Sequence, residues 1–226
     1  MSNTKQKEMK TYNLTAEPRT ELGKKASKML RNEGRIPMGL IGGEVVNLPY
    51  EGKLAEGQTI VNVPNNRGII VTNLSVKAED VRKLIYTPDI YAIELDVNGV
   101  KKAAILKEIQ FHPVKDEILY MDLLEVNDKK PVVVEVPVKL EGHAEGVKAG
   151  GKLTLSMKKL KVKAIYTNIP ERLVINVDNL GLGKTLQVGE LNFEGLELVN
   201  AKNAVVCAVQ LTRAARGAAA AAAAGK

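Results

Sequence analysis

The sequence predicts a mainly β protein: an N-terminal antiparallel β-barrel that carries small helices, followed by a second β-rich domain. Length is one reason, because 226 residues with 45% hydrophobic content can supply two ordinary cores. Composition is another, because two Phe, six Tyr and no Trp leave Val, Ile and Leu to fill those cores, and β-branched residues favour strands. Many short alternating runs separated by turn residues also indicate a barrel or curled sheet.

The chain is expected to divide into four segments. Residues 1–10 are polar and lack periodicity, which predicts a flexible basic leader. Residues 11–126 are expected to form the barrel domain and residues 127–212 the second domain. Residues 213–226 include a run of seven alanines that is too short to form a stable helix without packing, so they are expected to form a flexible tail.

A basic amphipathic helix is predicted for residues 24–33, ended by Gly34 as a left-handed residue. At about 100° per residue, its basic and apolar side chains fall on opposite sides. Residues 19–35 contain six basic and two acidic residues, whereas residues 36–126 contain nine basic and thirteen acidic ones. Such a local patch is typical of a polyanion site, and a solvated helix face is the alternative. The predicted basic side comprises Lys24, Lys28 and Arg31, and the predicted apolar side comprises Ala26, Met29 and Leu30.

Short strands and one further helix are expected in the rest of the first domain. Residues 36–43 predict an apolar loop or short strand with a turn at Gly42-Gly43, before a strand at 45–50. The clearest signal is the alternation over residues 91–109, where Asn98-Gly99 predicts a two-residue hairpin loop. The other expected elements are strands at 12–16, within 59–74 and at 118–124, and a helix from the N-cap Ser75 to about residue 85.

Two alternating runs open the predicted second domain. Residues 132–140 alternate strictly, but Pro137 lies within them, so this strand is expected at a sheet edge or with a bulge. Residues 159–164 alternate lysine with apolar residues. We expect the lysines to protect a sheet edge, and a second anion site is the alternative. Strands at 173–177, 196–199 and 204–210 complete the domain.

Catalytic and metal chemistry finds little support in the sequence. Residues 181–185 resemble the end of a phosphate-binding loop, but Asp178 stands where that motif needs glycine. His112 and His143 lack a third metal ligand at a recognisable spacing, and His112 is expected to fix a loop. The single cysteine, Cys207, is expected to be a buried small hydrophobe. We therefore predict no enzyme, catalytic residue, metal site, cofactor or small-molecule substrate.

Cellular location is also predicted. No stretch approaches the roughly eighteen apolar residues that a membrane span needs, and residues 1–10 lack the apolar core of a secretion signal. A lone cysteine excludes an internal disulfide framework and suits a reducing compartment. A soluble cytoplasmic protein without a membrane partner is expected.

Three stretches form recognisable signatures. Residues 19–37 read RxxxGKxASxxLRxxGxIP. Residues 109–113 read IQFHP and precede Asp122 in YMDL, and residues 131–138 read PVVVEVPV before a glycine-rich loop at 142–151. Together they resemble bacterial large-subunit ribosomal protein L25 in its long form, the general stress protein Ctc family. The resemblance covers nearly all of residues 12–211.

This resemblance implies a barrel that binds 5S ribosomal RNA around its loop E, a C-terminal β domain, and residence in the large ribosomal subunit. Relatives mostly carry arginine, tyrosine and histidine where this chain has Met29, Ile41 and Tyr120, and Met29 is expected to pack on the apolar side. Two functions stay open: a 5S-RNA-binding ribosomal protein, or a divergent paralogue with weakened binding that acts as a stress-associated interaction protein. The family's RNA-facing positions match Arg19, Lys24, Ser27, Lys28, Arg31 and Asp122, with Lys28 keeping charge where arginine is usual.

Overall fold

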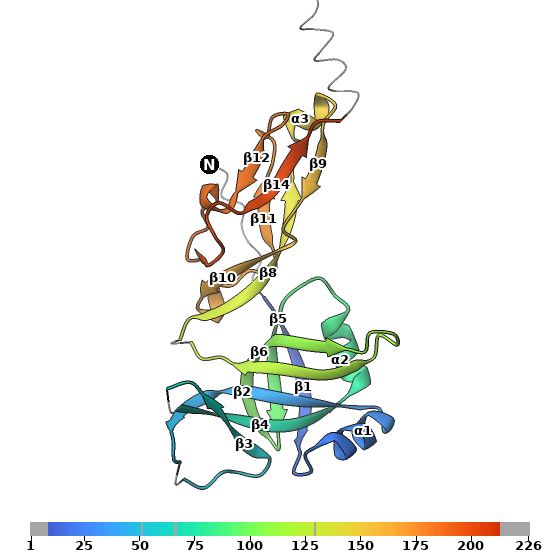
Figure 1. Ribbon diagram of the computed structural model, residues 1–226, viewed down its shortest axis with the longest axis vertical. Coiled ribbons are helices and arrows are strands. Elements are labelled where there is room, and N and C mark those ends of the chain that lie inside the picture. The colour runs from blue at the N-terminus through green and yellow to red at the C-terminus, as the bar shows by residue number, and fades with distance from the viewer. Residues whose placement is uncertain (1–8, 51, 66, 129, 213–226) are drawn as a thin grey trace, which may run out of the picture. The chain divides into compact units, whose positions relative to one another are not determined.

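The computed structural model describes residues 9–212 except 51, 66 and 129 (Figure 1). The described chain divides into two compact units, Met9–Lys130 and a unit that begins at Pro131. Strands predominate in both units, so the predicted β-rich class is confirmed. Most of the expected leader and the whole expected tail, 213–226, lie outside the described residues.

Six strands of the first unit close into a barrel, and a seventh extends one of its walls. The strands are β1 (Lys10–Pro18), β2 (Arg35–Asn47), β3 (Gln58–Val63), β4 (Arg67–Lys77), β5 (Tyr91–Val97), β6 (Val100–Phe111) and β7 (Ile118–Glu125). Their order is β1-β5-β6-β7-β2-β4-β3, and β4 also pairs with β1 to close the barrel. Pairs β1–β5 and β2–β7 are parallel, while the other pairings are antiparallel. The expected barrel is therefore present, but its strands run in mixed directions instead of being antiparallel throughout. Strands that are far apart in sequence are not joined by a hairpin, so they can pair in parallel.

Two helices belong to the first unit, α1 (Lys24–Asn32) and α2 (Ala78–Ile85). The prediction that Ser75 caps α2 was wrong. Ser75 is a buried residue of β4 that lies opposite β2 on one side and β1 on the other. Because β4 pairs with β2 as far as Lys77, the chain stays extended to Lys77, which is the actual N-cap.

Strand β2 is continuous, so the predicted turn at Gly42-Gly43 was also wrong. Its register with β4 shifts between Ile41 and Val45, which marks a bulge. Gly42 has φ 143°, and a Cβ there would lie 2.7 Å from the Cβ of Glu125. The glycine therefore allows the bulge to pass close to β7, and β2 continues to pair with β4 beyond it.

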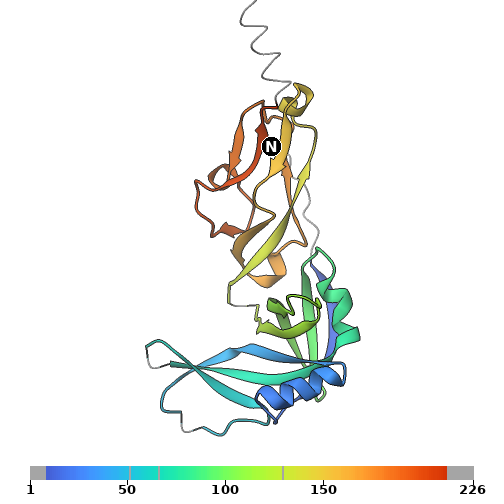
Figure 2. The ribbon, with the colours of Figure 1, turned by 45° about the vertical axis from the view of Figure 1, so that its right-hand side comes forward.

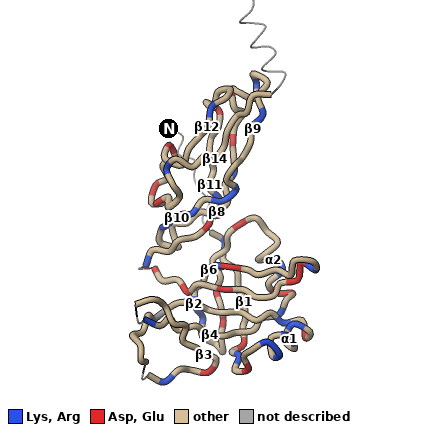
Figure 3. Tube along the Cα trace, in the orientation of Figure 1, with Lys and Arg blue, Asp and Glu red and all other residues tan. Residues whose placement is uncertain are grey.

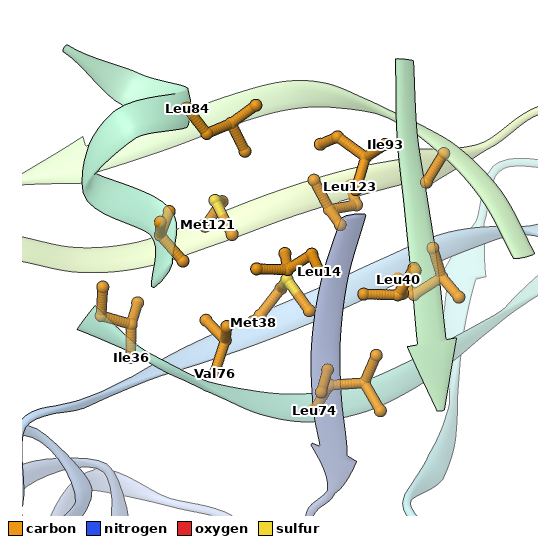
Figure 4. Packing of buried hydrophobic residues seen from close by; sticks show 14 residues of the cluster. Leu14, Ile36, Met38, Leu40, Leu74, Val76, Leu84, Ile93, Met121 and Leu123 are labelled. Atoms are coloured by element: carbon orange, nitrogen blue, oxygen red, sulfur yellow. The ribbon is translucent and has the colours of Figure 1, made fainter. Parts of the chain in front are cut away.

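Aliphatic and methionine side chains from all six barrel strands fill the interior (Figure 4). Each fully buried side chain of this size stabilises the fold by about 1.5–3 kcal/mol relative to exposure. The core needs no large aromatic ring, as the composition indicated. Members of this cluster include Leu14, Met38, Leu40, Leu74, Ile93, Leu95, Ala104, Met121 and Leu123, with Val81 and Leu84 from α2.

The second unit contains two small sheets. Its strands are β8 (Val132–Glu141), β9 (Lys152–Leu155), β10 (Lys159–Ala164), β11 (Leu173–Asn176), β12 (Thr185–Gln187), β13 (Glu197–Leu198) and β14 (Val205–Gln210). The orders are β11-β8-β10-β13 and β12-β14-β9. Short helical turns are α3 (Glu145–Lys148), η1 (Tyr166–Asn168) and η2 (Val188–Glu190). We did not predict β9, β12 or α3, which are too short to show a period of their own.

Strand β8 has partners on both sides, but over different residues, so its segment up to Pro137 is an edge on one side as expected, and no bulge is present over residues 132–141. Strand β10 pairs with residues 132–137, and β11 pairs on the other side with residues 138–141. Pro137 therefore stands where one ladder ends and the other begins. A residue without an N–H group is tolerated at such a changeover because it interrupts neither ladder.

The lysines of β10 do not protect an edge, because β10 lies between β8 and β13. Lys161 lies opposite Glu135, with 3.9 Å between Nζ and Oε1. Lys163 lies opposite Glu197, with 3.1 Å between Nζ and Oε2. The alternation is therefore explained by cross-strand ion pairs on an exposed face.

Two smaller expectations are confirmed. His112 fixes its loop, because its Nδ1 accepts hydrogen bonds from the backbone N–H groups of Val114 and Lys115, each at 3.2 Å. Cys207 is buried, and burial raises the pKa of its thiol. Over the described residues, no helix combines the length and apolar character needed to cross a membrane.

Candidate nucleic-acid interface

Helix α1 lies on the outside of the barrel and directs lysines into solvent. Lys24, Lys25 and Lys28 are all exposed. Gly23, with φ 108°, precedes the helix and turns the chain into it. Figure 3 shows the basic residues gathered along α1. Within the part of the chain that the structure describes, these three lysines form no ion pair, so their charges remain available to a polyanion.

The side of α1 that faces the barrel differs from the predicted side. Ser27, Leu30 and Arg31 are half-buried, whereas Met29 is 54% exposed. The predictions that Met29 packs inward and that Arg31 points outward with the lysines were therefore wrong. Arg31 turns inward because its Nη1 donates a hydrogen bond to the carbonyl oxygen of Leu119 in β7, at 3.2 Å. Periodicity within a helix cannot reveal a partner 88 residues away.

Arg19, immediately after β1, is held in place by three hydrogen bonds. Its Nη2 donates to Ser27 Oγ at 3.0 Å, its Nε donates to the carbonyl oxygen of Glu21 at 2.9 Å, and its backbone N–H donates to the carbonyl oxygen of Asn73 at 3.0 Å. Burial lowers the pKa of Arg19, nearby Tyr120 raises it and nearby Arg31 lowers it. An arginine remains charged at neutral pH, so this guanidinium is a fixed cation.

Tyr120 and Asp122 lie on β7 beside these arginines, and their side chains form a hydrogen bond. Burial, the charge of Asp122 and this bond raise the pKa of Tyr120 to about 12, while Arg19 acts in the opposite direction. The phenol is therefore protonated at neutral pH and donates its proton to the carboxylate. Half-buried and hydrogen-bonded to each other, the two side chains form a preorganised pair on the outer wall of the barrel, and their remaining lone pairs are acceptors.

Gly39 makes room for this arrangement. It lies opposite Asp122 in the parallel β2–β7 pair. A Cβ at this position would lie 2.4 Å from the hydroxyl oxygen of Tyr120 and 2.7 Å from Asp122 Oδ1. Neither Gly39 nor the Tyr120–Asp122 bond was predicted, although a glycine inside an apolar strand is a recognised sign of close approach.

Opposing influences act on the pKa of Asp122. Burial raises the pKa of its carboxyl, the hydrogen bond from Tyr120 and the charge of Lys107 lower it, and Glu108 raises it. The net direction is upward. An ionised Asp122 still has lone pairs free to accept bonds from outside the protein.

The structure thus brings four of the six predicted site residues together with Tyr120. We call this set the polar cluster. The remaining two, Lys24 and Lys28, lie on the exposed side of the same helix. Ile41, one of the positions that depart from the family pattern, is half-buried at the bulge of β2. The polar cluster comprises Arg19, Ser27, Arg31, Tyr120 and Asp122.

Comparison with known proteins adds an independent line of evidence. Residues 54–123 match the model of the "Ribosomal L25p family", and residues 131–213 match "Ribosomal protein TL5, C-terminal domain". The chain is 58% identical over 212 residues to the large ribosomal subunit protein bL25 of Porphyromonas gingivalis, covering 93% of this chain and 98% of the relative. Its identity to the bL25 of Parabacteroides distasonis is 56% over 215 residues, with the same two coverages. The bL25 of Bacteroides thetaiotaomicron is 65% identical over 152 residues, which are 67% of this chain and 78% of that protein.

Proposed function

The chain belongs to the bL25 family of large ribosomal subunit proteins, and we propose that it binds 5S ribosomal RNA through α1 and the polar cluster. The observation that carries this proposal is the position of a fixed arginine and a preorganised pair of acceptors on the same domain as exposed lysines that form no ion pair among the described residues. It therefore acts as a structural RNA-binding component of the cytoplasmic ribosome rather than as an enzyme.

The exposed side of α1 supplies affinity. Lys24, Lys25 and Lys28 are flexible cations that contact phosphates without reading sequence. Each phosphate that they neutralise releases counterions, so binding weakens as salt rises. These phosphate contacts determine the affinity for a folded RNA but contribute little to the selection of one RNA over another.

The polar cluster supplies selectivity. The guanidinium of Arg19 presents a planar set of donors to phosphate or base oxygens. The hydroxyl of Tyr120 and the carboxylate of Asp122 offer acceptors to base amino groups and to ribose 2′-hydroxyls. Because tertiary hydrogen bonds hold these groups, they recognise a distorted or open RNA surface, such as loop E, with little loss of side-chain entropy.

Titration of labelled 5S RNA with the full-length protein at several salt concentrations tests this function. The logarithm of the binding constant should fall with the logarithm of salt by roughly 0.7–0.9 for each phosphate contact. An unrelated RNA hairpin of equal length is the control and should bind far more weakly. Equal affinity for the two RNAs would reject the proposal and favour the alternative, a divergent paralogue with weakened 5S binding. That alternative rests on Met29, Ile41 and Tyr120, which depart from the family pattern.

A further inference from the structure

Asn73 of β4 lies at the point where that strand changes partners on one side. Strand β4 pairs with β3 as far as Thr72, and it pairs with β1 from Leu74 onward. At this changeover the N–H group of Asn73 donates to the carbonyl oxygen of Gly57 at 2.8 Å. The carbonyl oxygen of Asn73 accepts from the N–H group of Arg19 at 3.0 Å. The backbone of Asn73 therefore joins the residue before β3 to the residue that carries the fixed guanidinium.

The side-chain carboxamide of Asn73 is held by both of its N–H donors. Its Nδ2 donates to the carbonyl oxygen of Gly57 at 3.0 Å and to Oγ1 of Thr59 at 2.9 Å. These two bonds occupy both hydrogens of the amide and fix the direction in which it points. The amide oxygen, Oδ1, accepts no hydrogen bond from the described residues, and it is not buried, so it remains in contact with solvent. The half-buried Asn73 thus holds one free acceptor in a fixed direction.

Asn73 lies on the outer face of the barrel, in one row with the polar cluster. Its neighbour Leu74 is fully buried in the core, so alternation along β4 turns Asn73 outward. Gly39 of β2 lies opposite Asn73 on one side and opposite Asp122 on the other. Residues opposite one another share a face of the sheet, so the row crosses three strands. Figure 2 shows α1 beside the wall that β2 and β4 form, so this row and α1 lie on the same side of the barrel.

Gly39 leaves the middle of this row without a side chain. A Cβ on it would lie 2.4 Å from the hydroxyl oxygen of Tyr120 and 2.7 Å from Asp122 Oδ1, so these two groups border the glycine on the β7 side. Asn73 borders it on the β4 side. Neighbouring strands lie about 4.8 Å apart, so roughly 10 Å separates the backbones of Asn73 and Asp122. A ligand that approaches Gly39 therefore meets hydrogen-bond acceptors on both sides.

These acceptors select the chemistry of the ligand. Asn73 Oδ1 and the remaining lone pairs of Asp122 bind only a group that donates a hydrogen bond. RNA carries such donors as ribose 2′-hydroxyls and base amino groups, whereas its phosphates carry none. The carboxamide is also neutral, so it adds no charge that repels a polyanion.

We propose that Asn73 is a further RNA-contacting residue, whose fixed Oδ1 accepts a hydrogen bond from a 2′-hydroxyl or a base amino group of 5S RNA. The inference rests on the proposed function and extends its contact surface across β2 to β4. Gly57 and Thr59 are positioning residues, because they orient the carboxamide.

Asn73→Ala tests the contact, with Thr59→Val as the matched control. The first variant removes the oxygen, whereas the second removes one of the two anchors and leaves the oxygen in place. We expect Asn73→Ala to lower 5S affinity by about 3- to 10-fold, the range of one neutral hydrogen bond. The slope of log affinity against log salt should stay the same, because no phosphate contact is lost. Thr59→Val should change affinity less than about twofold, since the bond to Gly57 still holds the carboxamide.

Fluorescence anisotropy at several salt concentrations measures both quantities. Equal affinity of Asn73→Ala and the parent, or a changed salt slope, would overturn the proposal. Equal losses in Asn73→Ala and Thr59→Val would also overturn it, because the effect would then come from the anchor. If the parent itself binds 5S RNA no better than the unrelated hairpin, the proposed function falls as well. A parent that selects 5S RNA and an equally tight Asn73→Ala reject the Asn73 contact alone.

Thermal unfolding separates contact from stability. Both variants remove a hydrogen bond of the clamp, so both should melt below the parent, while only Asn73→Ala should lose affinity. Asn73→Leu keeps nearly the same side-chain volume without an acceptor. It should show the same loss of affinity, and it provides the measurement if Asn73→Ala does not fold.

Modified RNA identifies the donor. One pool of 5S RNA lacks single 2′-hydroxyls, and a second pool lacks single base amino groups. We expect one substitution, in one of the pools, to weaken binding of the parent but not of Asn73→Ala, because the lost partner is then already absent. The pool in which it occurs distinguishes a ribose contact from a base contact. If every substitution that weakens the parent weakens Asn73→Ala equally, Oδ1 contacts no RNA donor and the proposal is wrong.

Discussion

Helix α1 and strand β10 expose the same number of lysines in different electrostatic settings. Two of the lysines on β10 face glutamates on neighbouring strands, whereas those on α1 face none among the described residues. A sheet places a partner directly opposite each residue, so it neutralises charge at short range. A short helix on the outside of a barrel has no such neighbour on its outer side. The two sets are Lys24, Lys25 and Lys28 on α1, and Lys159, Lys161 and Lys163 on β10.

This difference shows that a lysine count does not locate an anion site. Exposed ion pairs contribute only about 0–1 kcal/mol to stability, but they still reduce the field that a polyanion meets. The α1 lysines have no acidic partner among the described residues, and the fixed guanidinium of Arg19 is bonded to Ser27 of the same helix. The functional contrast between the two rows is open to direct measurement.

Arg19→Ala should produce the largest effect. It removes the guanidinium that we propose to contact the RNA, and hydrogen bonds to charged groups contribute about 1.5–3 kcal/mol, so 5S affinity should fall by about 10- to 100-fold. Lys161→Ala is the matched control from β10 and should change affinity less than about twofold. Fluorescence anisotropy at fixed salt measures both. Equal losses would place the RNA contact elsewhere or make it diffuse.

Lys28→Ala should have a smaller effect, seen chiefly in the dependence on salt. One lost phosphate contact lowers the slope of log affinity against log salt by roughly 0.7–0.9. Lys163→Ala, which removes a lysine already paired with Glu197, should leave the slope unchanged. Titrations at four or more salt concentrations give the slope. A change of equal size in both variants would remove the distinction between the two lysine rows.

Asp122→Asn should have the smallest effect on the free protein. The pKa of Asp122 is raised in the folded state, so the folded protein binds more protons than the unfolded chain between the two pKa values. This group therefore lowers stability as pH rises from the ordinary aspartate value, about 3.9, through its raised folded value. The amide of the variant cannot ionise, so its thermal unfolding should lose this decrease and give a slightly higher Tm at pH 7 than the parent. A lower Tm at pH 7 would show that the carboxylate stabilises the polar cluster.

Local pattern was sufficient for several parts of the fold. Alternation over residues 91–109 predicted the hairpin of β5 and β6, and positive φ at both Asn98 and Gly99 matches the predicted turn. The predicted helix 24–33 agrees with α1, and Gly34 has φ 74°. These features depend on neighbours in sequence, which is why a sequence can reveal them.

Other features depended on partners that no local pattern contains. The long β2 strand and the strand position of Ser75 follow from pairing with β4, β7 and β1. The inward turn of Arg31 follows from the carbonyl of Leu119. In each case a distant backbone satisfied groups that local propensity would have placed in a turn, a cap or solvent.

The sequence by itself determined the β-rich class, the aromatic-poor cores, the basic stretch from Arg19 to Arg35 and the family resemblance, because these reside in composition and short-range order. Tertiary structure alone decided which side of α1 stays free, how Tyr120 and Asp122 meet above Gly39, and which lysines are neutralised. The reason is register: a shift of one residue between strands would exchange every inward and outward side chain.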